Sequence, residues 1–508
     1  MNEPIVRGLH TRFLRGLAAA PDGVAIRVGA EMLSYAAVHE RALAWAGALA
    51  DAPVVGVLAD KGMVSYVGVL AGLYAGATVV PLPPSFPVER IRQMLAIAGV
   101  SAVIADENGI ATMAEADSRV RVFAPEHPAL VDPGLRIPFG TALARPRSVD
   151  AAATAYVLFT SGSTGRPKAV PITHGSTEHY FRILDERYDF GTDDVFSQTF
   201  DLNFDCAMFD LFCGWGAGAA VHAVPAQAYR KLPQFFAERG ITVWFATPSA
   251  IALVRRLGGL TPGSMPTLRW SFFAGEALRC ADVEDWQAAA PRSTVENLYG
   301  PTELTVTIAV HRWSPDSSGA LAVNGVVPIG AIHDGHDYLL LDGEDDEGEL
   351  CIAGPQLTSG YLDPADNSGR FLERSGRTWY RTGDRVRRLA TGELAYLGRL
   401  DSQIQVQGWR VELGEVEHAV RGCAGVADAV AVAATHNGAT ELVVFYTGAR
   451  LATVELARQA RQRLPHGMVP KEFRYVDEFP LNTNRKVDRA RLARVAAGNS
   501  ALGVGRTV

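Results

Sequence analysis

One segment constrains the fold and chemistry of this chain more than any other: an apolar stretch, Ala155–Phe159, runs directly into a loop of hydroxyls and glycines that closes on Lys168. In such a loop, backbone N–H groups, hydroxyls and one ammonium can converge on phosphate oxygens. The Walker pattern GxxxxGK[ST] does not occur in the sequence, which disfavours P-loop kinases and ATPases. Taken alone, a Ser/Gly-rich turn before a lysine is more often a solvated loop, so its meaning depends on the rest of the chain.

Short apolar stretches alternate with helical stretches along most of the sequence. This alternation predicts α/β layers with mostly parallel sheets. From about Gly343, short strands bounded by glycines predict a smaller β-rich part. The expected strands are 54–58, 102–105, 155–159, 243–246 and 339–341, and the expected helices are 88–98 and 232–239.

The C-terminal part has the pattern of a separate unit. It contains expected strands at 403–406, 427–433 and 442–447, and expected helices at 413–421 and 453–464. The predicted fold class is therefore α/β, with a large multi-subdomain N-terminal domain (1–400) that includes the β-rich part, and a small mobile α+β lid domain (401–495). The Gly-rich tail, 496–508, is expected to be disordered.

Composition excludes several classes of protein. A chain of 508 residues with 48% apolar and 20% charged residues is typical of a soluble globular protein with a large core. The formal net charge of -7 does not favour nucleic acid, so we expect no such partner. The five cysteines are odd in number and lack a CxxC pair, which indicates neither a disulfide framework nor a zinc site.

Two segments bear on location. Four basic residues between positions 7 and 15 interrupt the apolar core of about 7–15 residues that a secretory signal needs, so we expect no export. The uncharged stretch 62–84 is nearly as long as a membrane span. Its glycines and closing prolines instead predict a buried helix to about residue 75 and a strand at 78–82. We therefore expect a cytoplasmic protein with no membrane partner.

The string from Tyr156 to Lys168 resembles the phosphate loop of the adenylate-forming superfamily, which contains acyl-CoA synthetases, luciferases and nonribosomal peptide adenylation domains. Five further segments resemble motifs of this family and occur in the family's order. They are 73–81 (early helix–strand motif), 297–303 (adenine and magnesium), 380–384 (ribose), 398–415 (hinge and the segment after it) and 484–489 (terminal lysine loop). Because the motifs span nearly the whole chain, chance does not account for the resemblance.

The resemblance implies a site for ATP and Mg²⁺. Attack of a carboxylate on the α-phosphate requires that accumulating negative charge be neutralised. By resemblance, Lys168 and the loop hold the β- and γ-phosphates, Thr302 contacts the α-phosphate, and Glu303 ligates Mg²⁺. Magnesium usually takes only one or two protein carboxylates, which suits a single glutamate. The implied loop residues are Thr160, Ser161, Gly162, Ser163, Thr164 and Gly165, and the other implied ATP-binding residues are Gly275, Glu276 and Gly300.

The nucleoside part of the site is implied in the same way. Asp384 would accept two hydrogen bonds from the ribose hydroxyls, with Arg399 nearby. Tyr299 and Tyr396 would flank the adenine, and Asn297 would reach its amino group. In isolation, Asp384 would be interpreted as a turn cap and Glu303 as an acid at a helix N-terminus. The collective match favours the functional interpretation.

The terminal lysine loop carries the last part of the predicted chemistry. Lys486 would bridge the attacking carboxylate and the α-phosphate when the lid closes. Asp401 matches the hinge about which the family's small domain rotates after adenylation, bringing the segment around Gly408 toward the site for thiol attack. Ala169 and Arg485 stand where the family usually has glycine, and we expect the methyl group of Ala169 to restrict the loop.

The acid substrate is predicted from the segment 200–212, which contains Phe-Asp three times. The register that fits the family best places Asp205 where amino-acid-activating members bind the α-ammonium. A fatty acid would leave this carboxylate unpaired at a cost of ~2–5 kcal/mol, so an amino acid is favoured. The competing interpretation is that Asp205 caps a helix. The remaining implied pocket residues are Cys206, Phe209, Phe245, Phe272, Ala274, Leu298, Val306 and Thr307, and their apolar character predicts a small or apolar side chain.

The acceptor is expected to be separate, because the sequence contains no carrier-protein segment with a phosphopantetheine serine. The chain thus resembles D-alanine–carrier-protein ligases and free-standing amino-acid adenylation enzymes of natural-product pathways. It is predicted to be an ATP-dependent, AMP-forming amino acid–carrier protein ligase. One rival is an acyl- or aryl-CoA ligase for a non-amino acid. A second is a non-catalytic nucleotide-binding protein, against which the presence of Lys168, Glu303, Asp384 and Lys486 argues.

Overall fold

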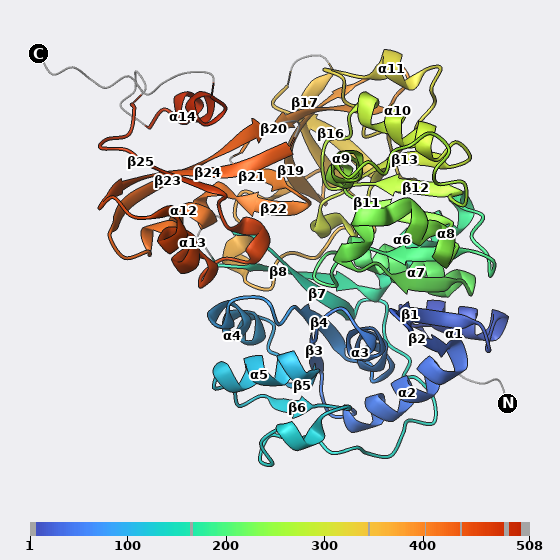
Figure 1. Ribbon diagram of the computed structural model, residues 1–508. Helices are drawn as coiled ribbons and strands as arrows, with labels where there is room; N and C mark the ends of the chain where they lie inside the picture. The colour runs from blue at the N-terminus through green and yellow to red at the C-terminus, as the bar shows by residue number, and fades with distance from the viewer. Residues whose placement is uncertain are drawn as a thin grey trace, which may run out of the picture. The chain divides into compact units, whose positions relative to one another are not determined.

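The computed structural model describes residues 7–162, 166–343, 346–401, 403–436, 439–481 and 487–498 (Figure 1). The chain divides into two compact units. Unit 1 comprises Met1–Pro84, Ile91–Thr160 and Lys168–Leu400, and unit 2 comprises Ser85–Arg90, Ser161–Pro167 and Asp401–Val508. The predicted α/β class, with a large N-terminal part and a small C-terminal part, is confirmed.

A nine-stranded sheet forms the largest layer of unit 1, in the order β15-β14-β13-β12-β11-β9-β10-β1-β2. The strands from β13 to β1 in this order pair in parallel, and only β15, β14 and β2 join antiparallel. Strands β11 and β12 are buried along their whole length, as expected for parallel strands covered on both faces. The strands are β1 (Val24–Val28), β2 (Glu31–Ser34), β9 (Val195–Gln198), β10 (Ala220–Ala223), β11 (Val243–Ala246), β12 (Trp270–Phe273), β13 (Thr294–Tyr299), β14 (Ala309–Arg312) and β15 (Ala331–Ile332).

A second sheet of unit 1 has six strands in the order β6-β5-β3-β4-β7-β8, and all of its pairs are parallel except β7 with β8. The uncharged stretch forms α3 (Met63–Tyr74) and β4 (Thr78–Leu82), as predicted. In the described part of the chain, no helix has both the length and the apolar character that crossing a bilayer requires. The other strands are β3 (Val54–Leu58), β5 (Ala102–Ala105), β6 (Arg121–Phe123), β7 (Thr154–Thr160) and β8 (Lys168–Thr173).

The predicted β-rich part is an antiparallel sheet of five strands, in which β19 is central. Its strands are β16 (Asp337–Leu341), β17 (Glu347–Ala353), β18 (Phe371–Arg374), β19 (Arg377–Arg388) and β20 (Leu394–Arg399). The helices of the N-terminal part are α1 (Thr11–Ala19), α2 (Tyr35–Ala48), α4 (Val88–Ile97), α5 (Glu107–Glu115), α6 (His174–Arg187), α7 (Cys206–Ala217), α8 (Leu232–Arg239), α9 (Pro248–Arg256), α10 (Cys280–Ala289) and α11 (Ser318–Leu321), with 3₁₀ turns η1 (Pro128–Leu130), η2 (Ala226–Lys231), η3 (Thr302–Leu304) and η4 (Pro364–Asn367).

Unit 2 contains a hairpin and a three-stranded sheet, with β24 between β23 and β25. The two residues of the hairpin turn, Gln407 and Gly408, both have positive φ (50° and 83°), which is the requirement of a type I′ turn. The last helix extends to Ala496, and residues 499–508 of the predicted tail lie outside the described residues. The elements are β21 (Gln403–Val406), β22 (Trp409–Glu412), α12 (Leu413–Arg421), β23 (Val426–His436), β24 (Ala439–Gly448), α13 (Thr453–Arg461), η5 (His466–Met468), β25 (Glu472–Tyr475) and α14 (Arg489–Ala496).

Candidate active site

The residues predicted to bind the acid gather in unit 1 where neighbouring parallel strands end. Ligands of open α/β sheets bind at the carboxyl ends of the strands, so this is the expected edge. Strands β11, β12 and β13 and helix α7, which carry most of these residues, are labelled in Figure 1. The residues are Phe245 in β11, Phe272 in β12, Ala274 just after it, Leu298 in β13, Asp205 at the start of α7, Cys206 and Phe209 within α7, and Val306 and Thr307 after η3.

Three phenylalanines form one side of this group. Phe209 lies 4.9 Å from Phe245 and 5.2 Å from Phe272, measured between ring centroids, and the three rings meet edge to face. All three side chains are fully buried. Tyr188 packs edge to face on Phe272 at 5.1 Å. Because these rings already contact one another, little space remains between them for a large substrate side chain.

Asp205 combines burial with an unsatisfied oxygen. It stands at the N-cap position of α7, but its side chain makes no capping hydrogen bond, and its buried Oδ2 has no hydrogen-bond partner among the described residues. Burial raises the pKa of the carboxyl to about 6, and Thr302 lowers it while Glu303 raises it. A buried acceptor without a partner is costly, and a substrate ammonium would satisfy it. Helix capping therefore does not account for this residue.

We expect activation of an amino acid to weaken as the pH falls below about 6. The Asp205 carboxylate is charged above its pKa of about 6 and neutral below it, and only the charged form pairs with an ammonium. The kcat/KM for the amino acid, measured between about pH 5 and 8, should fall on the acid side. Asp205→Asn should remove this acid limb. A kcat/KM that stays flat through pH 6 in the wild-type protein would contradict the assignment.

A strained turn links the pocket to η3. Thr305 and Val306 have φ of 58° and 67°, a left-handed conformation that β-branched residues rarely adopt. Gln356, which is fully buried, donates through Nε2 to the carbonyls of Leu304, Thr305 and Thr307. A Cβ at Gly300 would lie 2.6 Å from the Cα of Thr307, so the chain can pass this closely only with glycine. Such strain persists only where the surroundings enforce it.

Glu303 and Lys168 both contact the side chain of Tyr361. Glu303 is fully buried, and its Oε1 accepts a 2.5 Å hydrogen bond from the hydroxyl of Tyr361. The Nζ of Lys168 lies 5.2 Å from the centroid of the Tyr361 ring and 3.8 Å from Oδ1 of Asp366. A single carboxylate is a ligand set that fits Mg²⁺ together with phosphate oxygens, and the lysine ammonium would pair with the same phosphates rather than with the metal. Sequence reasoning missed Tyr361, which lies 58 residues from Glu303.

The predicted ribose residues are in contact. Asp384 in β19 is the register partner of Arg399 in β20. Its Oδ1 accepts a 2.8 Å hydrogen bond from Nη1 of Arg399, and its Oδ2 accepts a 2.6 Å bond from the hydroxyl of Tyr299. Asp384 is buried, so these charge-assisted bonds fix the orientation of its carboxylate.

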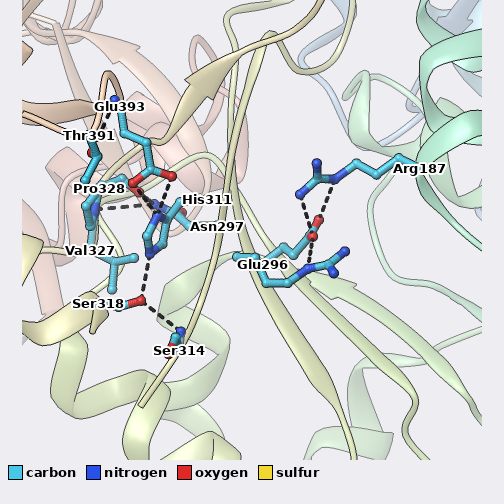
Figure 2. Close-up of polar contacts among 11 residues, drawn as sticks. Arg187, Glu296, Asn297, His311, Ser314, Ser318, Val327, Pro328, Thr391 and Glu393 are labelled. Atoms are coloured by element: carbon cyan, nitrogen blue, oxygen red, sulfur yellow. Dashed lines mark hydrogen bonds and ion pairs between the residues drawn. The ribbon is translucent and has the colours of Figure 1, made fainter. Parts of the chain in front are cut away.

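Asn297 is oriented by backbone carbonyls (Figure 2). Its Nδ2 donates to the carbonyl of Pro328 at 2.8 Å and, more weakly, to that of Val327 at 3.4 Å. The amide nitrogen is thereby engaged, and the amide oxygen is the acceptor that an adenine amino group requires. His311, its register partner in β14, is held between Glu393 and Ser318, with ring nitrogens 3.1 Å and 2.8 Å from their oxygens.

An ion cluster around the buried Glu296, which precedes Asn297 on β13, was missed by sequence reasoning. The fully buried Glu296 accepts a hydrogen bond from Nη2 of Arg187 at 2.7 Å (Figure 2). It also accepts one from Nε of Arg312 at 2.9 Å. The hydroxyl of Tyr188 donates to the same carboxylate at 2.6 Å. Because Tyr188 also packs on Phe272, this cluster supports the aromatic side of the candidate pocket.

The phosphate-loop residues are only partly described. Thr160 ends β7, Lys168 begins β8, and the two are register partners. Ala169 lies within β8 and pairs with Phe159, and its expected effect on the adjoining loop stays a prediction. Ser163, Thr164, Gly165 and Lys486 lie outside the described residues.

The remaining predicted positions lie partly in unit 2 and partly in unit 1. Within unit 2, Oγ of Ser161 donates to the carbonyl of Arg410 at 2.7 Å, and the N–H of Gly162 donates to Oε2 of Glu415 at 3.2 Å. In unit 1, Oε2 of Glu276 accepts from the N–H of Ser249 at 2.8 Å. Gly275 follows β12, Tyr396 lies in β20 and Asp401 follows β20, and the roles of all these residues stay predictions.

Comparison with known proteins decides the family. The model of the AMP-binding enzyme family matches residues 13–362, and that of the AMP-binding enzyme C-terminal domain matches residues 415–486. The chain belongs to the AMP-binding enzyme family. As a member it is an adenylate-forming enzyme, and its ligase activity depends on ATP.

Individual AMP-binding enzymes resemble the chain over nearly its whole length. An L-proline–[L-prolyl-carrier protein] ligase of Pseudomonas fluorescens is 30% identical and covers 96% of this chain and 99% of its own. The crystal structure of IdnL7 is 56% identical, with a TM-score of 0.77, and covers 98% of this chain and 100% of its own. The Vibrio cholerae adenylation domain AlmE, solved with glycyl-adenosine-5'-phosphate, is 28% identical, with a TM-score of 0.85, and covers 98% of this chain and 99% of its own. Other curated relatives are longer synthetases, of which the chain spans 6% to 41%.

Proposed function

We propose that this AMP-binding enzyme activates a small or apolar amino acid as an aminoacyl-AMP, releases pyrophosphate, and transfers the aminoacyl group to the phosphopantetheine thiol of a separate carrier protein. The observation that carries the proposal is the buried Asp205, whose Oδ2 has no partner in the described part of the chain and which stands at the start of α7, four residues before the buried Phe209. A substrate ammonium is the group that satisfies this oxygen, since a non-amino acid would leave it unpaired.

The size of the substrate side chain follows from the aromatic packing. Phe209, Phe245 and Phe272 are buried and in mutual contact, and Tyr188 and its ion cluster support Phe272. Enlarging the pocket would require several close-packed rings to move together, which is costly. A glycine, alanine, proline or small β-amino acid therefore suits the site better than a large or charged amino acid.

The proposed reaction has two displacement steps, and side chains of this protein are proposed to neutralise the negative charge of the phosphates. In the first, the substrate carboxylate attacks the α-phosphorus of ATP and pyrophosphate leaves; Lys168, Thr302 and Lys486 are the proposed phosphate contacts. Mg²⁺ held by Glu303 would neutralise phosphate charge when bound. Asp384 and Asn297 would hold the ribose and the adenine. In the second displacement, the carrier thiol attacks the aminoacyl carbonyl and AMP leaves.

The transfer step is supported by the names of similar proteins. The Pseudomonas fluorescens relative is named as a ligase that joins L-proline to a carrier protein, and AlmE was solved with a glycyl adenylate. Both names refer to small amino acids. They support a small amino acid and a carrier acceptor for this chain.

Thioester formation tests the acceptor. The protein would be incubated with ATP and a labelled small amino acid, together with a phosphopantetheinylated carrier protein, the same carrier without its arm, or free CoA. We expect label on the armed carrier only, detected by intact-protein mass spectrometry. Transfer to CoA in preference to every armed carrier would contradict the proposal and favour a CoA ligase.

A further inference from the structure

The loop between β9 and α7 leads to Asp205, and its first residue is held by two charged side chains. The Nζ of Lys61, which immediately precedes Gly62 at the start of α3, donates to the carbonyl of Thr199 at 2.7 Å. The N–H of Thr199 donates to Oδ2 of Asp210, a buried residue of α7, at 3.1 Å. Side chains from separate elements therefore bind both backbone polar groups of Thr199.

The next carbonyl of the loop is held as well. The Nε2 of Gln198 donates to the carbonyl of Phe200, and Oε1 of Gln198 accepts a 2.6 Å hydrogen bond from the hydroxyl of Tyr66 in α3. Gln198 and Tyr66 are fully buried. We call Lys61, Tyr66, Gln198 and Asp210 the loop clasp.

The clasped loop is in direct contact with the candidate acid pocket. The ring of Phe200 meets that of Phe245 edge to face at 4.9 Å, and Phe245 meets Phe209 at the same distance. The Oγ of Ser197 accepts hydrogen bonds from both the hydroxyl of Thr199 and the N–H of Phe245, each at 3.3 Å. A shift of Thr199 would therefore displace Phe200 and Phe245, and with them the aromatic side of the candidate pocket.

The charges of the clasp favour a positioning role. Burial lowers the pKa of Lys61 to about 8, against the attraction of Asp201 and Asp210, and burial raises the pKa of Asp210. Buried charges are costly to desolvate, and well-packed apolar residues often give equal or greater stability. A hydrogen-bonded clasp, unlike apolar packing, holds specific backbone atoms and so specifies one loop geometry.

We propose that Lys61 and Asp210 are positioning residues that set the selectivity of the acid pocket, acting through Thr199 and Phe200. The inference rests on the proposed amino-acid activation. It assigns a role in selectivity to residues that do not touch the substrate. One of them, Lys61, lies more than 100 positions before the pocket residues in the sequence.

The test is steady-state pyrophosphate release by Lys61→Met, Lys61→Arg and Asp210→Asn, with the exposed Lys231→Met as the matched control. Each variant would be assayed with the preferred amino acid, with a homologue longer by one or two methylenes, and with varied ATP. For Lys61→Met we expect the KM for the amino acid to rise about tenfold, the preference over the homologue to fall about tenfold, and the KM for ATP to change less than about twofold. For Lys61→Arg we expect smaller changes in both the KM for the amino acid and the preference over the homologue.

Three outcomes separate the possibilities. An unchanged preference ratio in Lys61→Met, with only a lower Tm, would show a purely structural role and overturn the inference. If Lys61→Met does not fold, Tyr66→Phe removes a single clasp hydroxyl and should shift the ratio in the same direction; an unchanged ratio would again overturn it. Silence of the wild-type protein with every amino acid would overturn the proposed function itself, and this inference with it.

Discussion

Asp205→Asn should raise the KM for the amino acid between about 30-fold and about 5,000-fold. The range corresponds to the ~2–5 kcal/mol lost when a buried charge pair loses one partner. Asparagine keeps the size of the side chain but cannot neutralise an ammonium, while the KM for ATP should change little. The measurement is amino-acid-dependent pyrophosphate release at saturating ATP.

The controls for this variant separate charge from folding. Asp193 is an exposed aspartate of unit 1, and Asp193→Asn should behave as wild type. A second control compares the amino acid with its analogue that lacks the amino group. Asp205→Asn should lose most of the discrimination between the two. If it keeps the wild-type KM and discrimination, Asp205 does not bind the ammonium.

Glu303→Gln should lower kcat for pyrophosphate release about 10²- to 10³-fold and raise the Mg²⁺ concentration needed for half-maximal rate. The kcat should fall because the neutral amide of glutamine cannot hold Mg²⁺ against the phosphates. Loss of one transition-state charge contact lowers a rate by about this factor. Glutamine retains an oxygen that can accept from Tyr361, so the fold should be preserved. The measurement is the rate of pyrophosphate release as a function of Mg²⁺ concentration.

Two further variants make the glutamate result interpretable. The exposed Glu284→Gln should leave both kcat and Mg²⁺ dependence unchanged. Tyr361→Phe removes the hydrogen bond to Glu303 and keeps the carboxylate, so it should lower the rate much less than Glu303→Gln. A Glu303→Gln protein with wild-type Mg²⁺ dependence would exclude this residue as the metal ligand.

Elements with a strong local pattern could be predicted from the sequence. Strand β11 and helix α8 have the predicted bounds, because an apolar run between polar turns and an amphipathic stretch ending before glycine are local signals. Helix α14 was missed within a basic run. A signal was present there, since the core-facing Leu492, Val495 and Ala496 have the i, i+3, i+4 spacing of a helix.

The contacts of the candidate site could not be predicted in the same way. The resemblance located Asp205, Glu303 and Asp384, and the structure shows what surrounds them. The partners that hold them come from distant segments: Tyr361 is 58 residues from Glu303, and Tyr299 is 85 residues from Asp384. Such pairs depend on how the sheets pack, and no local pattern encodes them.

The most direct test of amino-acid activation is acid-dependent pyrophosphate release from ATP across a panel of D-, L- and β-amino acids, each paired with the analogue that lacks the amino group, together with short aliphatic and aryl acids. We predict release with at least one small or apolar amino acid and near-background release with its paired analogue. Release only with acids that lack an amino group would contradict the central claim.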